Sequence, residues 1–385
     1  MMRLGLAVLL ALGSVDDDAI ILTNARIVCV TGETIEKGFL VIRDGKIAEL
    51  GGGTTQAKGR VVDLTGKVVI PGLINGASAL GVVGNTNEDG EEVAPQVRIL
   101  DSFDPRSGEL SRARQSGVTV AFIEPGNRGV IGGVASVVKT AGASRSAMIV
   151  RDEAAIKAAM GLAPAQGNFA PRGSAATFFT RRPTTRMGVA WEFRKAFFDA
   201  RKVQEPAVMV QALAGTLPVR IAASRVTDIE TALQLAEELH LQISLEEAQE
   251  AYKRAPLLAS KKIAVFLRPA PPPASSEPEE FRPDTFTRLV RAGVATALLA
   301  PHEKPEALLG TVAFAVREGA TPAEALRAVT ATPAELLGVA GRIGSIDVGK
   351  DADLVVLSGA PHEVTTLVEK VMIDGRWVYG EKAVQ

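Results

Sequence analysis

Short runs of β-branched and alternating apolar residues occupy both ends of the chain and predict β-strands there. Near the N-terminus these runs are 19–30 and 39–50, and an Asp-Gly pair at 44–45 divides the second. Near the C-terminus an Asp-Gly pair at 374–375 divides the run 368–379 in the same way. Asp-Gly between apolar runs is typical of tight hairpins. We therefore expect one small β-sandwich assembled from the two termini.

Between these ends, strand-like apolar runs alternate with longer amphipathic runs. The strand-like runs are 118–123, 147–150, 219–222, 242–245, 263–267 and 294–299, with a weaker one at 134–138. The helix-like runs include 186–203, 228–239, 305–318 and 322–329. This alternation is typical of a parallel α/β domain.

The length of the alternating region favours one α/β architecture over another. Roughly 260 residues separate the two β segments, which suits a (β/α)₈ TIM-like barrel. A doubly wound sheet is the alternative, but it would need a glycine-rich phosphate turn after its first strand, and 75–78 is not one. We predict a barrel at 71–339 and a composite β-sandwich at 19–70 and 340–385.

Composition excludes several classes of function. The 385 residues hold 43 Lys and Arg against 44 Asp and Glu, so there is no bulk attraction to nucleic acid or to an anionic membrane. Aromatic residues are only 4% of the chain, which argues against base-stacking surfaces. One cysteine and three histidines (His240, His302, His362) nearly exclude a metal centre built from those side chains.

The N-terminal residues have the pattern of an export signal. A short basic start, Met1 to Arg3, precedes an apolar stretch at 4–12 that is too short to span a bilayer. Small residues follow at Ala11 and Gly13, as at a cleavage site. We expect 1–18 to be a signal peptide with a short polar start, the protein to be periplasmic or secreted, and no later membrane span. A buried N-terminal strand or a misassigned start is the alternative.

The C-terminal third carries the longest family resemblance. The runs 331–338 and 344–356 (GSIDVGKDADLVV) resemble the segment that leads metal-dependent amidohydrolases from the last barrel helix back into the β-sandwich. Shorter runs resemble the imidazolonepropionase-like exported branch of that superfamily; they are 117–120, 131–139, 183–188 and 217–220. The resemblance implies the same barrel-and-sandwich fold and hydrolysis of C–N bonds.

The first barrel strand departs from the family at its metal ligands. The run 68–74 (VVIPGLI) matches, and in the family it is followed by Asp-x-His-x-His, whose histidines hold the metal. Here Asn75, Ala77 and Ala79 occupy those places. A methyl group has no lone pair to give a metal.

The other family ligand positions are altered as well. A His-x-His becomes Ala222 and Ser224, a further histidine becomes Glu247, and Pro301 or Ala300 stands where an aspartate is expected. Such enzymes need the metal to make hydroxide from bound water. The resemblance therefore implies a degenerate member with no metal, no other cofactor and no catalytic residue of the family type.

Some polar side chains remain that we expect at the former active-site mouth, where they would bind a small molecule: Asn75, Lys139, Arg225, Glu247 and His302. Lys139 matches a family lysine near the Gly-Gly loop, and a carboxylated lysine bridges metals in some relatives. An ion-paired structural lysine is the alternative.

Three functional hypotheses follow. The first is a pseudoenzyme that keeps the barrel as a binding or scaffold module. The second is an active hydrolase on a cyclic amide or peptide-like C–N bond, with Lys139, Glu247 and His302 converging around a hard cation. The third is a silent subunit, in a homo-oligomer or with an active paralogue. The ligand or substrate is unknown in each case, and no nucleic-acid partner is expected.

Overall fold

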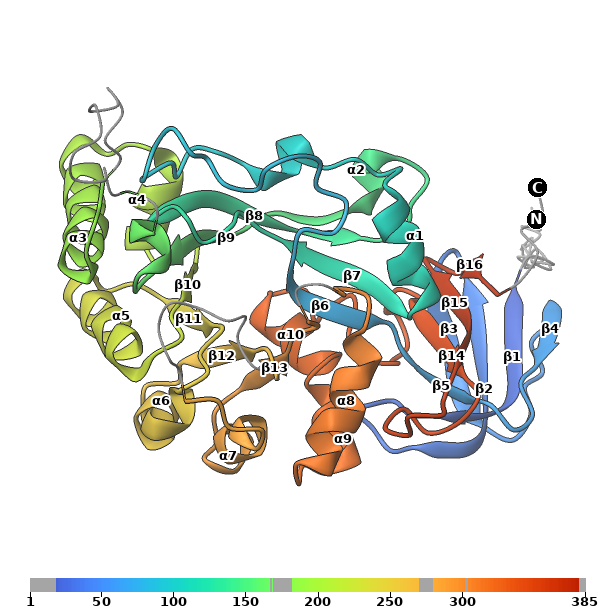
Figure 1. The fold of residues 1–385 in the computed structure, drawn as a ribbon. Coiled ribbons are helices and arrows are strands. Elements are labelled where there is room, and N and C mark those ends of the chain that lie inside the picture. The colour runs from blue at the N-terminus through green and yellow to red at the C-terminus, as the bar shows by residue number, and fades with distance from the viewer. Residues whose placement is uncertain (1–18, 167, 169–181, 270–279, 302–303, 381–385) are drawn as a thin grey trace, which may run out of the picture.

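A computed structural model describes residues 19–166, 168, 182–269, 280–301 and 304–380 (Figure 1). These residues form two sheets with helices around one of them. The predicted signal peptide, 1–18, lies outside the described residues and stays a prediction. No helix in the described part is long and apolar enough to cross a membrane.

Both ends of the chain build one sheet, as predicted; we call it the terminal sheet. Its order is β16-β15-β14-β5-β1-β2-β3, with β4 paired to β1. The strands are β1 (Ile20–Ile27), β2 (Ile35–Arg43), β3 (Lys46–Gly52), β4 (Arg60–Asp63), β5 (Val68–Pro71), β14 (Leu354–Leu357), β15 (Val368–Ile373) and β16 (Arg376–Tyr379). The two ends meet where β14 pairs antiparallel with β5.

The two Asp-Gly hairpins are present. Asp44 and Gly45 have φ of 50° and 76°, and Asp374 and Gly375 have φ of 48° and 70°. Positive φ at both central residues is what a tight two-residue hairpin requires, and Gly and Asp tolerate it best. The terminal sheet encloses its own apolar core, which includes Leu22, Leu40, Val69, Leu354 and Met372.

The second sheet, here the barrel sheet, has the order β13-β12-β11-β10-β9-β8-β7-β6. Its strands are β6 (Leu73–Ser78), β7 (Val118–Ile123), β8 (Ile131–Lys139), β9 (Ile149–Ala159), β10 (Val219–Ala222), β11 (Ile243–Glu246), β12 (Ala264–Leu267) and β13 (Thr296–Leu298). The end strands β6 and β13 approach each other, so the sheet nearly closes into the predicted TIM-like barrel (Figure 1).

One strand departs from an ideal (β/α)₈ barrel. Neighbouring strands are parallel except β8, which runs antiparallel to both β7 and β9. Only 124–130 connects β7 to β8. A parallel crossover needs a dozen or more residues, so this short connection can only make a hairpin.

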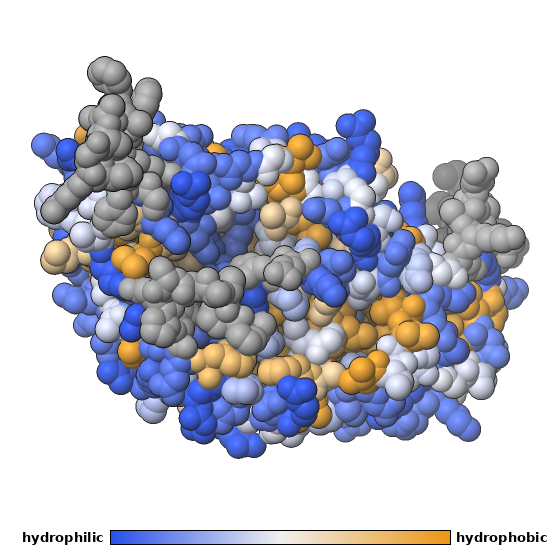
Figure 2. Space-filling view, in the orientation of Figure 1, coloured by the Kyte–Doolittle hydropathy of each residue, from blue (hydrophilic) through white to orange (hydrophobic). Residues whose placement is uncertain are grey.

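Helices cover the outside of the barrel sheet (Figure 1). They are α1 (Gly108–Gln115), α2 (Arg145–Met148), α3 (Arg186–Val203), α4 (Ala207–Leu213), α5 (Val226–Leu239), α6 (Ala255–Ser260), α7 (Thr285–Arg291), α8 (Leu308–Arg317), α9 (Pro322–Arg327) and α10 (Ala331–Leu336). On the face seen in Figure 2 hydrophilic residues predominate, and hydrophobic residues gather in several separate groups.

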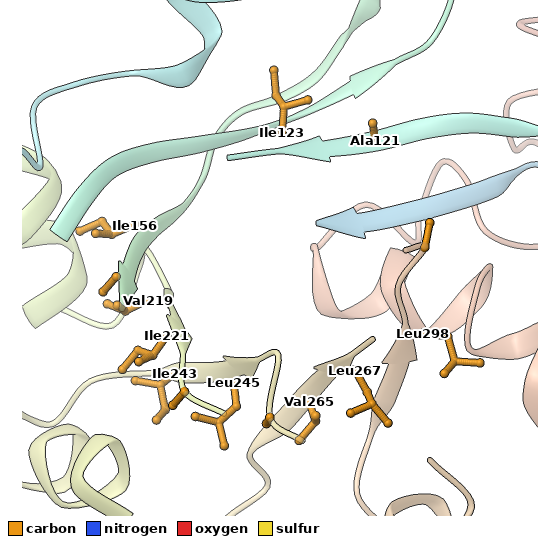
Figure 3. Packing of buried hydrophobic residues seen from close by; sticks show 14 of the residues in the cluster. Ala121, Ile123, Ile156, Val219, Ile221, Ile243, Leu245, Val265, Leu267 and Leu298 are labelled. Atoms are coloured by element: carbon orange, nitrogen blue, oxygen red, sulfur yellow. The ribbon is translucent and has the colours of Figure 1, made fainter. Parts of the chain in front are cut away.

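Alternate strand residues face the helices and the barrel interior. Ile156, Val219, Ile221, Ile243 and Leu245 belong to the large core shared with the helices (Figure 3). A separate interior core contains Phe122, Phe266 and Leu299. Because strand side chains alternate with period two, the residues between the outward-facing ones point into the barrel.

Candidate functional site

Because side chains alternate along a strand, three charged side chains point into the barrel interior. Lys157 lies between Ile156 and Ala158 on β9, Arg220 lies on β10 and Glu246 ends β11. They are exposed by only 1%, 2% and 2% of their surface. A buried charge is tolerated only when it is paired and hydrogen-bonded.

Lys157 is paired with two carboxylates. Its Nζ lies 2.7 Å from Oε2 of Glu246 and 3.0 Å from Oε1 of Glu124, the residue that follows β7. We call Lys157, Glu124, Glu246 and Arg220 the interior charge cluster. Four strands therefore deliver one side chain each to the same point.

Arg220, the fourth member of the cluster, is held by hydrogen bonds and by aromatic rings. Its Nη1 donates to the carbonyl of Gly76 at 3.0 Å and its Nε donates to Oγ of Ser244 at 2.9 Å. The guanidinium also lies 3.4 Å from the ring centre of Phe266 and 4.5 Å from that of Phe122. Stacking of this kind favours a guanidinium over other cations in a dry interior.

The cluster separates the pKa values of its two acids. Burial opposes ionisation of Glu246, yet Lys157 and Arg220 prevail and lower its pKa to about 2. Burial, reinforced by the neighbouring Glu246 carboxylate, raises the pKa of Glu124 well above its ordinary value. Burial alone would lower the pKa of Lys157, but the two acids raise it. Glu246 and Lys157 thus form the ion pair, and Glu124 is the acid that keeps its proton longest.

A cavity of about 460 Å³ opens above the cluster at the carboxyl ends of the strands; we call it the mouth cavity. Its wall includes Ala77, Ala79, Glu124, Asn127, Lys157, Glu246, Glu247, Arg268 and Pro301. A smaller cavity of about 150 Å³ adjoins it and shares Asn127 and Glu247. Carboxyl ends of barrel strands are where TIM-barrel enzymes place their active sites.

The positions at which the family resemblance predicts metal ligands meet at this end of the barrel. Ala77, Ala79 and Pro301 line the mouth cavity, Ala222 and Ser224 line the smaller one, and Glu247 lines both. A divalent metal of the family type does not fit these residues, because they offer methyl groups, a hydroxyl, a proline ring and the single carboxylate of Glu247 in place of several imidazoles. Within the described ranges, no three His, Cys, Asp or Glu side chains are grouped to hold a metal.

Three other predicted site residues, Asn75, Arg225 and Glu247, differ in whether they line a cavity. Asn75 is fully buried and donates from Nδ2 to the carbonyl of Pro305 at 2.9 Å, so it ties β6 to a neighbouring loop. Arg225 precedes α5 and lines the smaller cavity. Glu247 has a left-handed backbone with φ of 55°, and its Oε2 accepts from Nδ2 of Asn127 at 3.4 Å. His302 lies outside the described residues.

The predicted position of Lys139 at the mouth is wrong. Because β8 runs antiparallel, its last residue lies at the opposite end of the barrel, against the terminal sheet. There Nζ of Lys139 lies 2.9 Å from Asp351, 2.9 Å from Asp353 and 2.6 Å from Asp374. The ion-paired alternative is correct, and the convergence of Lys139 with Glu247 and His302 that an active hydrolase required is contradicted by this position.

Sequence reasoning missed Lys157, Glu124 and Arg268. A signal for Lys157 was present, because it is the single charge in the apolar run 154–159 (AAIKAA) and so had to point into the protein. Glu124 and Arg268 each directly follow a buried strand, the usual place for site residues in a barrel.

The chain is similar in sequence and in structure to known amidohydrolases. A model of the Amidohydrolase family matches residues 293–378. The crystal structure of an amidohydrolase from Thermotoga maritima MSB8 is 32% identical with a TM-score of 0.86, covering 94% of this chain and 99% of that one. A prolidase solved with N-methylphosphonate-L-proline shares the fold, at 19% identity and a TM-score of 0.60, over 94% of this chain and 99% of its own.

A curated relative is longer than this chain. Amidohydrolase tasK from Hapsidospora irregularis is 25% identical over an alignment 368 positions long, and the match covers 82% of this chain and 37% of that protein. The chain thus spans little more than a third of this curated relative.

Proposed function

Because this chain belongs to the amidohydrolase family, we propose that it is a member without metal-dependent C–N hydrolysis, whose barrel mouth serves to bind a small molecule. The fold and the family are established by the similarity above, whereas the loss of hydrolysis and the binding role are proposed.

The observation that carries the proposal is the buried ammonium of Lys157. It lies within 3.0 Å of Glu124 and 2.7 Å of Glu246, the two acids at the base of the mouth cavity. A divalent cation placed there would face a like charge at close range instead of a lone pair. These two carboxyl groups are already used by the internal cation.

The distribution of altered residues supports the same conclusion. The turn at 349–353 still joins the barrel to the terminal sheet, and Asp351 and Asp353 within it bind Lys139. By contrast, Ala77, Ala79 and Ala222 stand at the ligand positions. Residues that hold the fold are kept while those that would hold the metal are absent.

Metal content and turnover test this proposal. We expect protein purified without chelators to hold less than stoichiometric zinc, manganese or iron by mass spectrometry. We also expect no hydrolysis of dipeptides or cyclic amides when these metals are added, with an active metal-dependent amidohydrolase as the positive control. One tightly held metal per chain, with turnover that a chelator abolishes, would refute the proposal.

A specific surface feature favours the silent subunit as a second candidate. Met187, Trp191 and Phe198 on α3 are exposed by 80%, 56% and 44%. Their spacing of four and seven residues places them on one side of the helix. Large apolar side chains gathered on one helix face mark interaction sites more often than solitary ones do. A second copy or an active paralogue would bury this face.

A further inference from the structure

Arg268 is a buried cation of the mouth cavity, and one of its hydrogen-bond donors has no partner among the described residues. It follows β12, its side chain is 8% exposed, and it lines the cavity. Its Nε is buried and has no hydrogen-bond partner among the described residues. The acid nearest to its Nη2 is Glu247, whose Oε1 is 4.0 Å away, which is too long for a hydrogen bond.

The other buried cations of the barrel interior differ from Arg268. Lys157 has two carboxylates within 3.0 Å, and Arg220 donates to Gly76 and Ser244 while it stacks on two rings. Buried donors are almost always satisfied, so an unsatisfied guanidinium Nε calls for an explanation. The edge formed by Nε and Nη2 is the fork that binds a carboxylate through two parallel hydrogen bonds.

An acceptor without a partner lies near this fork. Oδ1 of Asn127 is buried and has no hydrogen-bond partner within the described ranges, while its Nδ2 donates to Glu247. Glu247 therefore lies between Arg268 and Asn127. A ligand that displaces Glu247 from Arg268 would offer its anion to the guanidinium and a hydroxyl or amide N–H to Asn127.

The charge of the cavity wall decides which anion fits. The cavity is lined by three cations, Arg268, Arg112 and Lys157, and by five acids, Glu109, Glu124, Glu246, Glu247 and Glu306. A dianionic phosphate would meet these carboxylates with twice the repulsion of a singly charged acid. A cavity of about 460 Å³ also restricts the ligand to a small molecule.

We propose that the mouth cavity binds a small organic monocarboxylate on the Nε–Nη2 edge of Arg268, with a donor of the ligand on Asn127. This inference rests on the proposed non-catalytic function and names the class of its ligand. Nε is buried in the present conformation, so binding requires the side chains around it to move. Oε1 of Glu247 lies 4.0 Å from Nη2 of Arg268, beyond hydrogen-bond length, so no direct hydrogen bond between these two atoms has to break.

Calorimetric titration of the full chain tests the inference. The probes are propionate, lactate, the neutral isostere propionamide, and phosphate, all at one ionic strength. We expect propionate and lactate to bind, lactate more tightly because its hydroxyl reaches Asn127, and propionamide and phosphate to bind at least about tenfold more weakly.

Variants locate the site. Arg268→Lys keeps the charge but removes the fork and should weaken lactate binding by about tenfold or more. Arg201→Gln removes an exposed arginine in the last turn of α3, outside the cavity wall, and this variant should bind lactate as the wild type does. Circular dichroism checks that each variant is folded, and if Arg268→Lys does not fold, the propionate and propionamide comparison on the wild type still decides.

Some outcomes overturn the inference. They are no binding of either carboxylate, equal binding of propionamide, or unchanged affinity in folded Arg268→Lys. If the protein is metal-free and inactive but does not bind carboxylates, the inference of a carboxylate site is refuted and the proposed loss of hydrolysis stands. A tightly held metal with turnover would refute the proposed function instead.

Discussion

At the residue scale, Lys157 is the side chain on which the site depends. It is the only charge in an apolar strand segment, and its pairing with Glu246 at 2.7 Å is shielded from water. An exposed pair of the same length, Lys195 with Asp199, lies on α3. Removing one partner of a buried ion pair lowers the stability of the fold more than removing one partner of an exposed pair with the same geometry. The reason is that the remaining buried acid keeps its desolvation penalty.

Lys157→Met should therefore destabilise the fold by up to about 3–5 kcal/mol, because Glu246 loses its ammonium partner at 2.7 Å and keeps only the guanidinium of Arg220 at 3.7 Å. The measurement is the free energy of unfolding from urea titration. Lys195→Met is the matched control and should change stability little. Adding Glu246→Gln to Lys157→Met should recover much of the loss. A small effect of Lys157→Met alone would contradict the ion pair described here.

At the element scale, the direction of β8 determines where Lys139 lies, and the orientation of α3 determines which of its apolar side chains are exposed. The short 124–130 connection makes β8 a hairpin partner of β7, and this direction sends Lys139 away from the mouth. Helix α3 begins where Thr185 accepts from the backbone N–H of Gly188, and its buried side, with Phe193 and Phe197, packs on the barrel. Its opposite side presents the apolar residues that favour an interface.

Trp191→Lys is expected to lower the molar mass seen by light scattering if α3 joins two copies of the chain. The reason is that an introduced ammonium would be buried without a partner in the interface. Val364→Lys is the control, since Val364 is 90% exposed outside α3 and its replacement should leave the mass unchanged. A wild type that is monomeric and captures no paralogue would count against the silent-subunit candidate.

At the scale of the whole molecule, the junction between barrel and terminal sheet depends on one cation shared by three acids. Lys139 contacts Asp351, Asp353 and Asp374. Burial opposes ionisation of Asp351, yet Lys139, Lys46 and Arg342 lower its pKa. Asp353 is less well compensated, and its burial outweighs Lys139 and raises its pKa from 3.8 to about 6.

The junction therefore gives a pH dependence with a defined sign. Between pH 3.8 and about 6 the folded state holds a proton on Asp353 that the unfolded state has released, so stability falls as pH rises through this window. The stability of the wild type relative to Asp353→Asn should fall by about 3 kcal/mol across it. Urea titrations of both proteins at several pH values measure this difference. A difference that is flat or rises with pH would contradict the raised pKa.

The sequence by itself determined the fold class and which side chains stand where the family resemblance expects metal ligands. Apolar periodicity records which side chains are buried, so it gave the strands of both ends and the alternating barrel. Residue identity alone excluded histidine ligands at Ala77 and Ala79. The same alternation could have marked Lys157 as an interior residue.

Only the tertiary structure decided which charged side chains meet. Periodicity carries no information on strand direction or register, and these depend on connections and on pairing between distant segments. The direction of β8 moved Lys139 to the terminal sheet, and the register of β9, β10 and β11 brought Lys157, Arg220 and Glu246 together. The spare guanidinium edge of Arg268 follows from that same packing, because a side chain's partners are set by its neighbours in space.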